Sequence, residues 1–124
     1  MDTREVIETY YRAATAGDWD AWLDLFHEDV VMDEQLAGHV EGKDFLREVV
    51  EAIKTGYEKF ENVPKHIVVE ADRAAAITHI SARSQGIDVE ADAANYFELR
   101  DGKIVYTANI HDTVPFQPFM AQEG

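Results

Sequence analysis

The chain has no cysteine among its 124 residues. Disulfide scaffolds, thiol nucleophiles and thiolate metal sites are therefore excluded. Basic residues are also scarce, because 11 lysines and arginines stand against 25 aspartates and glutamates, for a formal net charge of −14. A surface of this sign repels phosphate backbones and anionic lipids. We therefore expect no nucleic-acid partner and no membrane partner, and we favour a neutral or cationic small ligand.

Long hydrophobic runs are missing as well. The longest apolar stretches are far shorter than a membrane span, and no basic segment followed by an apolar one marks a leader. These absences predict a cytoplasmic protein. A chain of this length typically folds around one core, so we expect residues 1–124 to form a single domain.

The first half of the chain has the periodicity of helices. Asp2 and Glu5 have capping-box spacing, and Gly17 is a natural helix stop. An apolar pattern from Lys43 continues for nearly five turns until Pro64 bars continuation. We predict helices over residues 2–17, 18–26 and 43–60, a short strand over 30–34, and a loop containing Gly38 and Gly42.

The second half changes to a period of two, which is typical of strands. We predict strands at about 65–71, 73–85, 88–100 and 103–112. Asp101 and Gly102 form a strong hairpin signal, and Gly86 and Ile87 are expected to form another two-residue loop. The predicted strand register pairs Leu99 with Ile104, Asn95 with Ala108, Ala82 with Ala91 and Arg83 with Glu90.

This register assigns side chains to two faces of the sheet. It directs Tyr106, Ala108 and Asp112 inward and sends His79 and His111 to the outer face. The inner face is rich in alanine, which leaves space against a helical layer. We predict an α+β fold in which three N-terminal helices pack in a curved antiparallel sheet, a cone-shaped roll with an internal pocket.

Four polar side chains interrupt the predicted inner face: Tyr10, Glu34, Asn95 and Asp112. A buried polar group without a partner is costly, so their convergence indicates mutual bonding, water or a ligand. A carboxylate in an apolar hollow is suited to take a proton from carbon next to a carbonyl, and neutral donors can meet the resulting enolate oxygen. Asp112 is the first choice of base and Glu34 the second, with Tyr10 and Asn95 as donors. Further pocket residues are predicted to be Thr78, His39, Trp22, Phe97, Tyr106 and Ala108.

Each of these four residues also has a structural interpretation. Tyr10 can be an ordinary core residue, and Asn95 can bridge to Thr78. Asp112 can be solvated or cap the tail, which reads as irregular. Glu34 points to solvent if the neighbouring Asp33 turns inward instead.

Signals for other chemistries are weak. The five histidines have no spacing typical of metal ligands, and no phosphate-binding loop or seryl nucleophile motif is present. We therefore expect no metal site and no cofactor.

Three segments resemble the nuclear-transport-factor-2-like superfamily, in its SnoaL-like polyketide cyclase and ketosteroid isomerase branches. They are AGDWDAWLDLFHEDVVMDE, EGKDFLREVV and FELRDGKIVYTANIHD. The resemblance implies that Tyr10 matches an oxyanion-hole tyrosine and Glu34 the isomerase base. It also implies that Asn95 stands where isomerases keep a protonated acid, and that Asp112 matches the base of the cyclases.

The resemblance implies a cofactor-independent acid/base enzyme that acts on a small hydrophobic carbonyl compound, of the isomerase or cyclase type. A non-catalytic ligand-binding or dimerisation module on the same fold is the alternative, and an epoxide hydrolase or dehydratase is the third. Members of the superfamily commonly pair through the outer sheet face. We therefore expect a homodimer built on Ile77, Tyr96, Val105 and Thr107.

Overall fold

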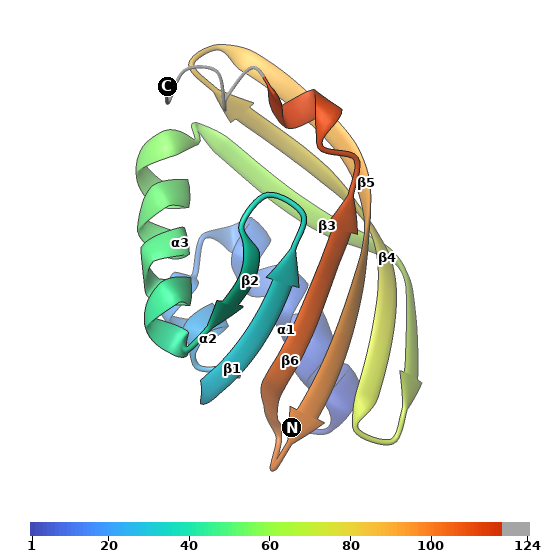
Figure 1. Cartoon of the computed structure of the whole chain (residues 1–124). Coiled ribbons are helices and arrows are strands. Elements are labelled where there is room, and N and C mark those ends of the chain that lie inside the picture. The colour runs from blue at the N-terminus through green and yellow to red at the C-terminus, as the bar shows by residue number, and fades with distance from the viewer. Residues whose placement is uncertain (118–124) are drawn as a thin grey trace.

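The computed structural model describes residues 1–117 and has an α+β fold (Figure 1). Three α-helices lie against one face of a six-stranded sheet. In chain order the elements are α1 (Thr3–Ala16), α2 (Trp19–Leu23), β1 (Phe26–Glu34), β2 (Gly38–Glu41), α3 (Lys43–Gly56), β3 (Lys59–Glu70), β4 (Arg73–Ser84), β5 (Ile87–Arg100), β6 (Lys103–His111) and the 3-10 helix η1 (Val114–Phe116).

The sheet is mixed, which corrects the prediction of a fully antiparallel one. Its strand order is β2-β1-β6-β5-β4-β3, and β1 runs parallel to β6. The other neighbouring strands are antiparallel. Turn signals identify hairpins between consecutive strands, whereas β1 and β6 are separated by most of the chain. Local patterns therefore could not reveal their pairing.

The helix starts follow the sequence signals more closely than the helix ends do. The Asp2 side chain accepts a hydrogen bond from the Glu5 backbone N–H at 2.9 Å, and Gly17 ends α1 with a φ of 73°. The second and third helices end three or four residues earlier than predicted. Strand β3 therefore begins at Lys59 and includes Pro64, which an edge strand tolerates at a bulge. The predicted loop before α3 contains strand β2.

The turn between β4 and β5 is placed one residue earlier than predicted. Gln85 and Gly86 are the loop residues, with φ angles of 53° and 77°. Such a turn favours glycine in its second position, which explains why the predicted Gly86-Ile87 loop is wrong. Ala82 therefore lies opposite Val89, two residues from its predicted partner. A shift of two preserves the face of every side chain, so the inner face of β5 is as predicted.

A bulge in β6 reverses the predicted orientation of the rest of this strand. Leu99 pairs with Ile104 as predicted, but Glu98 pairs with Tyr106, which makes Val105 an extra residue. An insertion of one residue exchanges the two faces of a strand. The residues of β6 that face inward are therefore Thr107, Asn109 and His111.

None of the helices within residues 1–117 is long and apolar enough to cross a membrane. Residues 118–124, the last part of the tail that was predicted to be irregular, lie outside the described part of the chain. The preceding segment forms η1, whose Phe116 is buried against Val89 and Ala91.

Candidate functional site

A cavity of about 240 Å³ lies between the helices and the sheet. Its walls are mostly apolar and aromatic, and a few polar side chains project into it from β1, β5 and β6. Pockets of this kind, apolar with a small number of converging polar groups, are typical of small-molecule sites. The polar residues that line it include Tyr10, Glu34, Asn62, Asn95, Thr107, Asn109 and His111.

Glu34 lies at the end of β1 and shares the inward face of this strand with Val30 and Met32. Its side chain is 17% exposed, so the prediction that it faces inward is confirmed. One carboxylate oxygen, Oε2, accepts hydrogen bonds from the backbone N–H groups of Leu36 and Ala37, both at 2.7 Å. The tight turn after β1 thus holds the carboxylate in place and leaves Oε1 directed elsewhere.

His111 meets that second oxygen. Its Nε2 lies 2.6 Å from Glu34 Oε1, and its side chain is only 7% exposed. The other ring nitrogen, Nδ1, lies 3.0 Å from the backbone carbonyl oxygen of Asp112. The ring of Phe116 packs against the imidazole, with ring centres 5.1 Å apart. The prediction that His111 lies on the outer face is therefore wrong, because the β6 bulge turns it inward.

These contacts orient the imidazole of His111. A carbonyl oxygen can only accept a hydrogen bond, so Nδ1 of His111 is the donor to Asp112. Nε2 and Glu34 Oε1 lie at hydrogen-bond distance, so one proton can be shared between them. The pair therefore places a proton-sharing contact in the cavity wall.

Tyr10 projects from α1 into an aromatic cluster that includes Trp22, Phe26 and Phe97, with ring centres 5.0 to 6.1 Å away. Burial raises the pKa of its hydroxyl well above the ordinary value, and the nearby charge of Glu34 raises it further. The group therefore stays a neutral donor at any physiological pH. Within residues 1–117 the Tyr10 hydroxyl makes no hydrogen bond to a protein group.

Asn95 is held by two neighbours that the sequence analysis did not assign to it. Its Oδ1 accepts a hydrogen bond from the Tyr11 hydroxyl at 2.5 Å, and its Nδ2 donates to Asn109 Oδ1 at 2.9 Å. Burial raises the pKa of Tyr11 as well, so this hydroxyl remains a donor. Asn95 does line the cavity, but the alternative in which it bridges to Thr78 is wrong.

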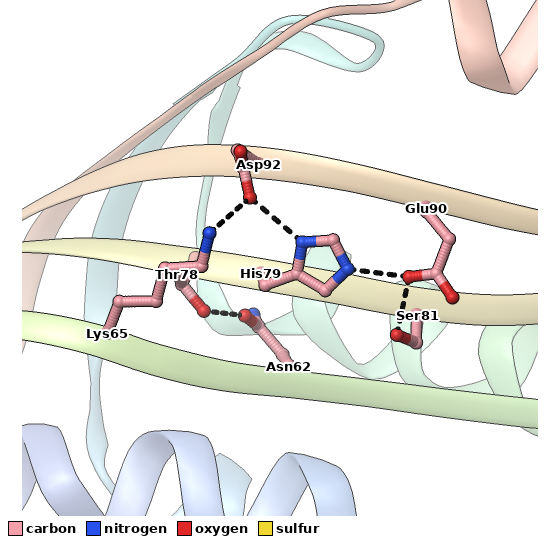
Figure 2. Close-up of polar contacts among 7 residues, drawn as sticks. All are labelled: Asn62, Lys65, Thr78, His79, Ser81, Glu90 and Asp92. Carbon is pink, nitrogen blue, oxygen red and sulfur yellow. Dashed lines mark hydrogen bonds and ion pairs between the residues drawn. The ribbon is translucent and has the colours of Figure 1, made fainter.

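Thr78 instead donates to Asn62 Oδ1, on the inner side of the sheet (Figure 2). Thr78 is fully buried behind this contact and does not line the cavity, whereas Asn62 does. The Thr15 hydroxyl donates to the Asn62 carbonyl oxygen at 3.1 Å. Thr78, which was predicted to bind the ligand, therefore lies behind Asn62 and contacts the cavity only through it.

The structure contradicts the predicted position of Asp112. Its side chain is exposed, and Oδ1 accepts a hydrogen bond from the Val114 backbone N–H at 3.0 Å. This is the alternative in which Asp112 caps the tail. The cause is the extra residue Val105, which moves every later residue of β6 to the opposite face.

The same bulge displaces two further predicted pocket residues, Tyr106 and Ala108, neither of which lines the cavity. The Tyr106 hydroxyl donates to Asp33 Oδ2 at 2.6 Å, which raises the pKa of Tyr106 and lowers that of Asp33. His39 is exposed on β2 with Nδ1 2.6 Å from Asp33 Oδ1, so it is not a pocket residue either. Phe97 is fully buried in the core beneath the Tyr10 ring, while Trp22 lines the cavity as predicted.

The residues that sequence reasoning missed, His111, Asn109 and Thr107, share one origin. All three lie beyond the β6 bulge, and their orientation follows from the observed pairing of β5 with β6. The register with the bulge exposes Ile110 and buries His111, and the register without it does the reverse. Strand periodicity alone cannot choose between these two registers.

A second polar cluster lies on the outer face of β3, β4 and β5 (Figure 2). His79 Nδ1 lies 2.8 Å from Asp92 Oδ1, and its Nε2 lies 2.6 Å from Glu90 Oε2. Lys65 and Ser81 complete the network by donating to Asp92 and Glu90, respectively. Hydrogen bonds to Asp92 and then to Glu90 raise the pKa of His79. The cluster is solvent-exposed and lines no enclosed hollow, so it is not the candidate site.

The chain belongs to the SnoaL-like domain family, whose model matches residues 7–107. A search of curated proteins gave no significant match. The fold and the mostly apolar cavity just described agree with this membership.

Solved structures with the same fold cover nearly the whole chain. A candidate polyketide cyclase from Pseudomonas putida has 25% sequence identity and a TM-score of 0.79, with 94% of this chain and 96% of that chain covered. TerC, co-crystallised with polyporic acid, has 22% identity and a TM-score of 0.83, with 96% and 98% covered. An NTF2-like protein of unknown function from Burkholderia pseudomallei has 14% identity and a TM-score of 0.85, with 95% and 96% covered.

Proposed function

We propose that this protein catalyses proton transfer on a small, largely hydrophobic carbonyl compound, as an isomerase or a cyclase of the SnoaL-like type does. The observation that carries the proposal is the contact between Glu34 and His111 inside an apolar cavity. Similarity to a candidate polyketide cyclase supports this class of reaction. In this proposal the helices and the curved sheet form a cone around the substrate.

The chemistry uses the two ends of the proton-sharing pair. The Glu34 carboxylate takes a proton from the carbon next to the substrate carbonyl, which leaves an enolate. The Nε2–H group of His111 then lies beside Glu34 and can return a proton to the same or another carbon. Because both groups stand in a mostly apolar wall, their electrostatic effect on the substrate is stronger than in water.

The enolate oxygen requires a donor that is already in place. The Tyr10 hydroxyl meets this requirement, since it lines the cavity and has no protein partner in the described part of the chain. Asn95 lines the same cavity, and only one of its two Nδ2 protons is used by Asn109. We assign Tyr10 as the main donor and Asn95 as a second one.

Solvent deuterium exchange tests this function. We expect the protein to accelerate deuterium uptake into 2-tetralone, an enolisable bicyclic ketone. Glu34→Gln should lower the rate at least a hundredfold, and His111→Gln should lower it as well, because each variant breaks the pair. Glu41→Gln is the matched control, since this exposed glutamate lies on the neighbouring β2.

Undiminished exchange in both Glu34→Gln and His111→Gln would contradict the base assignment. Binding of 2-tetralone without any protein-dependent exchange would favour the alternative of a non-catalytic ligand-binding module.

We also propose that the protein forms a homodimer through the outer face of its sheet. Ile77 and Ile110 are 46% and 57% exposed there, and Val68 is 67% exposed. Of the four residues predicted for this interface, Thr107 is excluded because it is buried on the inner face. Ile110, which the β6 bulge turns to the outer face, replaces it.

A further inference from the structure

Asn109 lies directly beside Glu34 in the cavity wall. The two residues are partners in the parallel pairing of β1 with β6, and neighbouring strands of a sheet are about 4.8 Å apart. Both line the cavity, so their side chains project from the same face of the sheet. Burial and then the nearby charge of Glu34 raise the pKa of the Tyr10 hydroxyl, so this donor is also near the carboxylate. An amide and a phenol therefore accompany the candidate base.

Two hydrogen bonds fix the orientation of the Asn109 amide. The Tyr11 hydroxyl has no other acceptor among the described residues, so it donates its proton to Asn95 Oδ1 at 2.5 Å. Asn95 then has only its Nδ2 for Asn109, whose Oδ1 accepts this bond at 2.9 Å. Asn109 therefore turns its oxygen toward Asn95 and its nitrogen away from it.

The nitrogen of Asn109 has donor capacity to spare. An amide nitrogen carries two protons, and within residues 1–117 the only partner of Asn109 Nδ2 is Met32 Sδ at 3.6 Å. A thioether sulfur is a weak acceptor. The oxygens of Glu34 accept instead from the turn after β1 and meet His111. A partly buried N–H group without a good acceptor costs free energy, which favours a ligand that supplies one.

The position of this N–H group suits the oxygen of an enolate. In the proposed reaction Glu34 takes a proton from the carbon next to the carbonyl, so the carbonyl oxygen is only one carbon further away. That oxygen lies within reach of the side chain beside Glu34. An amide can stabilise the negative charge there as a neutral donor that is already in place.

We propose that Asn109 is a further substrate-contacting residue, whose Nδ2–H group donates to the carbonyl oxygen of the substrate and to the enolate that forms from it. Glu34 takes the proton, the electron pair of the C–H bond forms the C=C bond of the enolate, and the negative charge moves to the oxygen that Asn109 contacts. Tyr11 and Asn95 act as positioning residues behind it. The inference rests on the proposed function for the identity of the substrate as a ketone.

A matched pair of ligands tests the contact by binding alone. 2-Tetralone carries an acceptor oxygen where 2-methylenetetralin has a CH₂ group of similar shape. We expect the wild-type protein to bind 2-tetralone roughly tenfold more tightly, because only the ketone accepts hydrogen bonds. Asn109→Asp keeps the oxygen that accepts from Asn95 but loses the N–H donor, and Asn109→Leu loses both. In each variant the preference should fall by about fivefold.

Gln35→Glu is the matched control for the change of charge. It makes the same amide-to-carboxylate substitution next to Glu34 in the sequence, at an exposed position that does not line the cavity. The preference for 2-tetralone should be unchanged in this variant.

Solvent deuterium exchange provides the catalytic readout. The acceptor oxygen gains charge as the enolate forms, so a donor to it contributes more in the transition state than in the bound ketone. Both Asn109 variants should therefore lower the rate of deuterium uptake into 2-tetralone by about a hundredfold, with a smaller loss of affinity. A purely structural role predicts instead that the rate falls only with the fraction of folded protein.

A spectroscopic measurement on the wild type does not depend on how a variant folds. The chain has three asparagines, and the side-chain amide signals of Asn109 can be assigned through its own β protons. 2-Tetralone should move these signals downfield, because the amide gains an acceptor, and 2-methylenetetralin should not.

The proposal is overturned if 2-tetralone does not bind, if both Asn109 variants keep the preference, or if the Asn109 amide signals respond equally to both ligands. Exchange that depends on Glu34 but is undiminished in the Asn109 variants would leave the proposed function standing and remove Asn109 from it. A preference that depends on Asn109 without any protein-dependent exchange would support the contact and contradict the catalytic proposal.

Discussion

At the scale of single residues, neighbours in the sequence differ in burial and in hydrogen-bond partners. His111 is buried against Glu34, while Asp112 beside it is exposed and caps the following turn. Tyr11 donates to Asn95, while the hydroxyl of its neighbour Tyr10 has no protein partner among residues 1–117. Each pair consists of one residue that supports the structure and one that is available for a ligand. Substitutions within such pairs therefore separate stability from function.

The two tyrosines provide the first of these tests. Tyr11→Phe removes the donor to buried Asn95 Oδ1, so we expect the free energy of unfolding to fall by about 1–3 kcal/mol. Tyr10→Phe should change stability less but lower the exchange rate by about a hundredfold, the usual cost of losing an oxyanion donor. Chemical denaturation and deuterium exchange measured on both variants check this. Equal losses of stability in the two would contradict it.

Two buried threonines provide the second test. Thr107→Val replaces a hydroxyl without a protein partner by a methyl group of the same shape, so we expect the free energy of unfolding to rise by about 1 kcal/mol. Thr78→Val is the control, since the Thr78 hydroxyl donates to Asn62 and its loss should destabilise the protein by a similar amount. Thermal unfolding of both variants distinguishes them. A destabilised Thr107→Val would show that the hydroxyl is satisfied without a ligand.

At the scale of elements, the bulge in β6 decides the composition of the site. Without the extra Val105, Asp112 would lie on the inner face and His111 on the outer face. The bulge also places Ile110 on the outer face, where it is exposed. One inserted residue thus supplies the cavity with an imidazole and the outer face with an apolar side chain. Bulges are common beside functional sites for this reason.

The outer cluster on β3, β4 and β5 predicts a pH effect. Because hydrogen bonds to Asp92 and Glu90 raise the pKa of His79, we expect an NMR titration to give a value above the ordinary 6.5. Stabilisation by this histidine is fully present below 6.5 and is lost as the pH rises through the higher value of the folded state. Asp92→Asn should lower the pKa of His79, whereas Asp88→Asn, which changes a carboxylate that pairs with Arg83, should not.

At the scale of the whole molecule, a strongly acidic chain carries an apolar outer sheet face. A net charge of −14 opposes the association of two copies, while Ile77, Ile110 and Val68 favour it. We expect the apolar contact to prevail at physiological ionic strength, where charge repulsion is screened over about 8 Å.

Sedimentation tests this proposal. The wild-type protein should have twice the 14.0 kDa mass of the chain, and Ile110→Lys should yield the monomer. Lowering the salt concentration should weaken the dimer, because it restores the repulsion between two acidic chains. A wild-type monomer at every salt concentration would refute the dimer. Val114→Lys, an exposed position on η1, is the control substitution and should leave the mass unchanged.

The sequence by itself determined the features that depend on near neighbours. Capping by Asp2, the helix stop at Gly17, the hairpin at Asp101 and Gly102, and the inner face of β5 follow from local preference and periodicity. It also placed Glu34 on the inner face, because this residue shares the alternation of β1.

The tertiary structure alone decided the features that depend on register and on distant pairing. The parallel contact between β1 and β6, the shifted β4–β5 turn and the bulge at Val105 arise when the whole sheet packs against its helices. A change of one residue in register leaves local energies nearly equal but exchanges the two faces of a strand. For that reason the sequence identified the carboxylate of the candidate site, whereas only the folded sheet brought His111 to it.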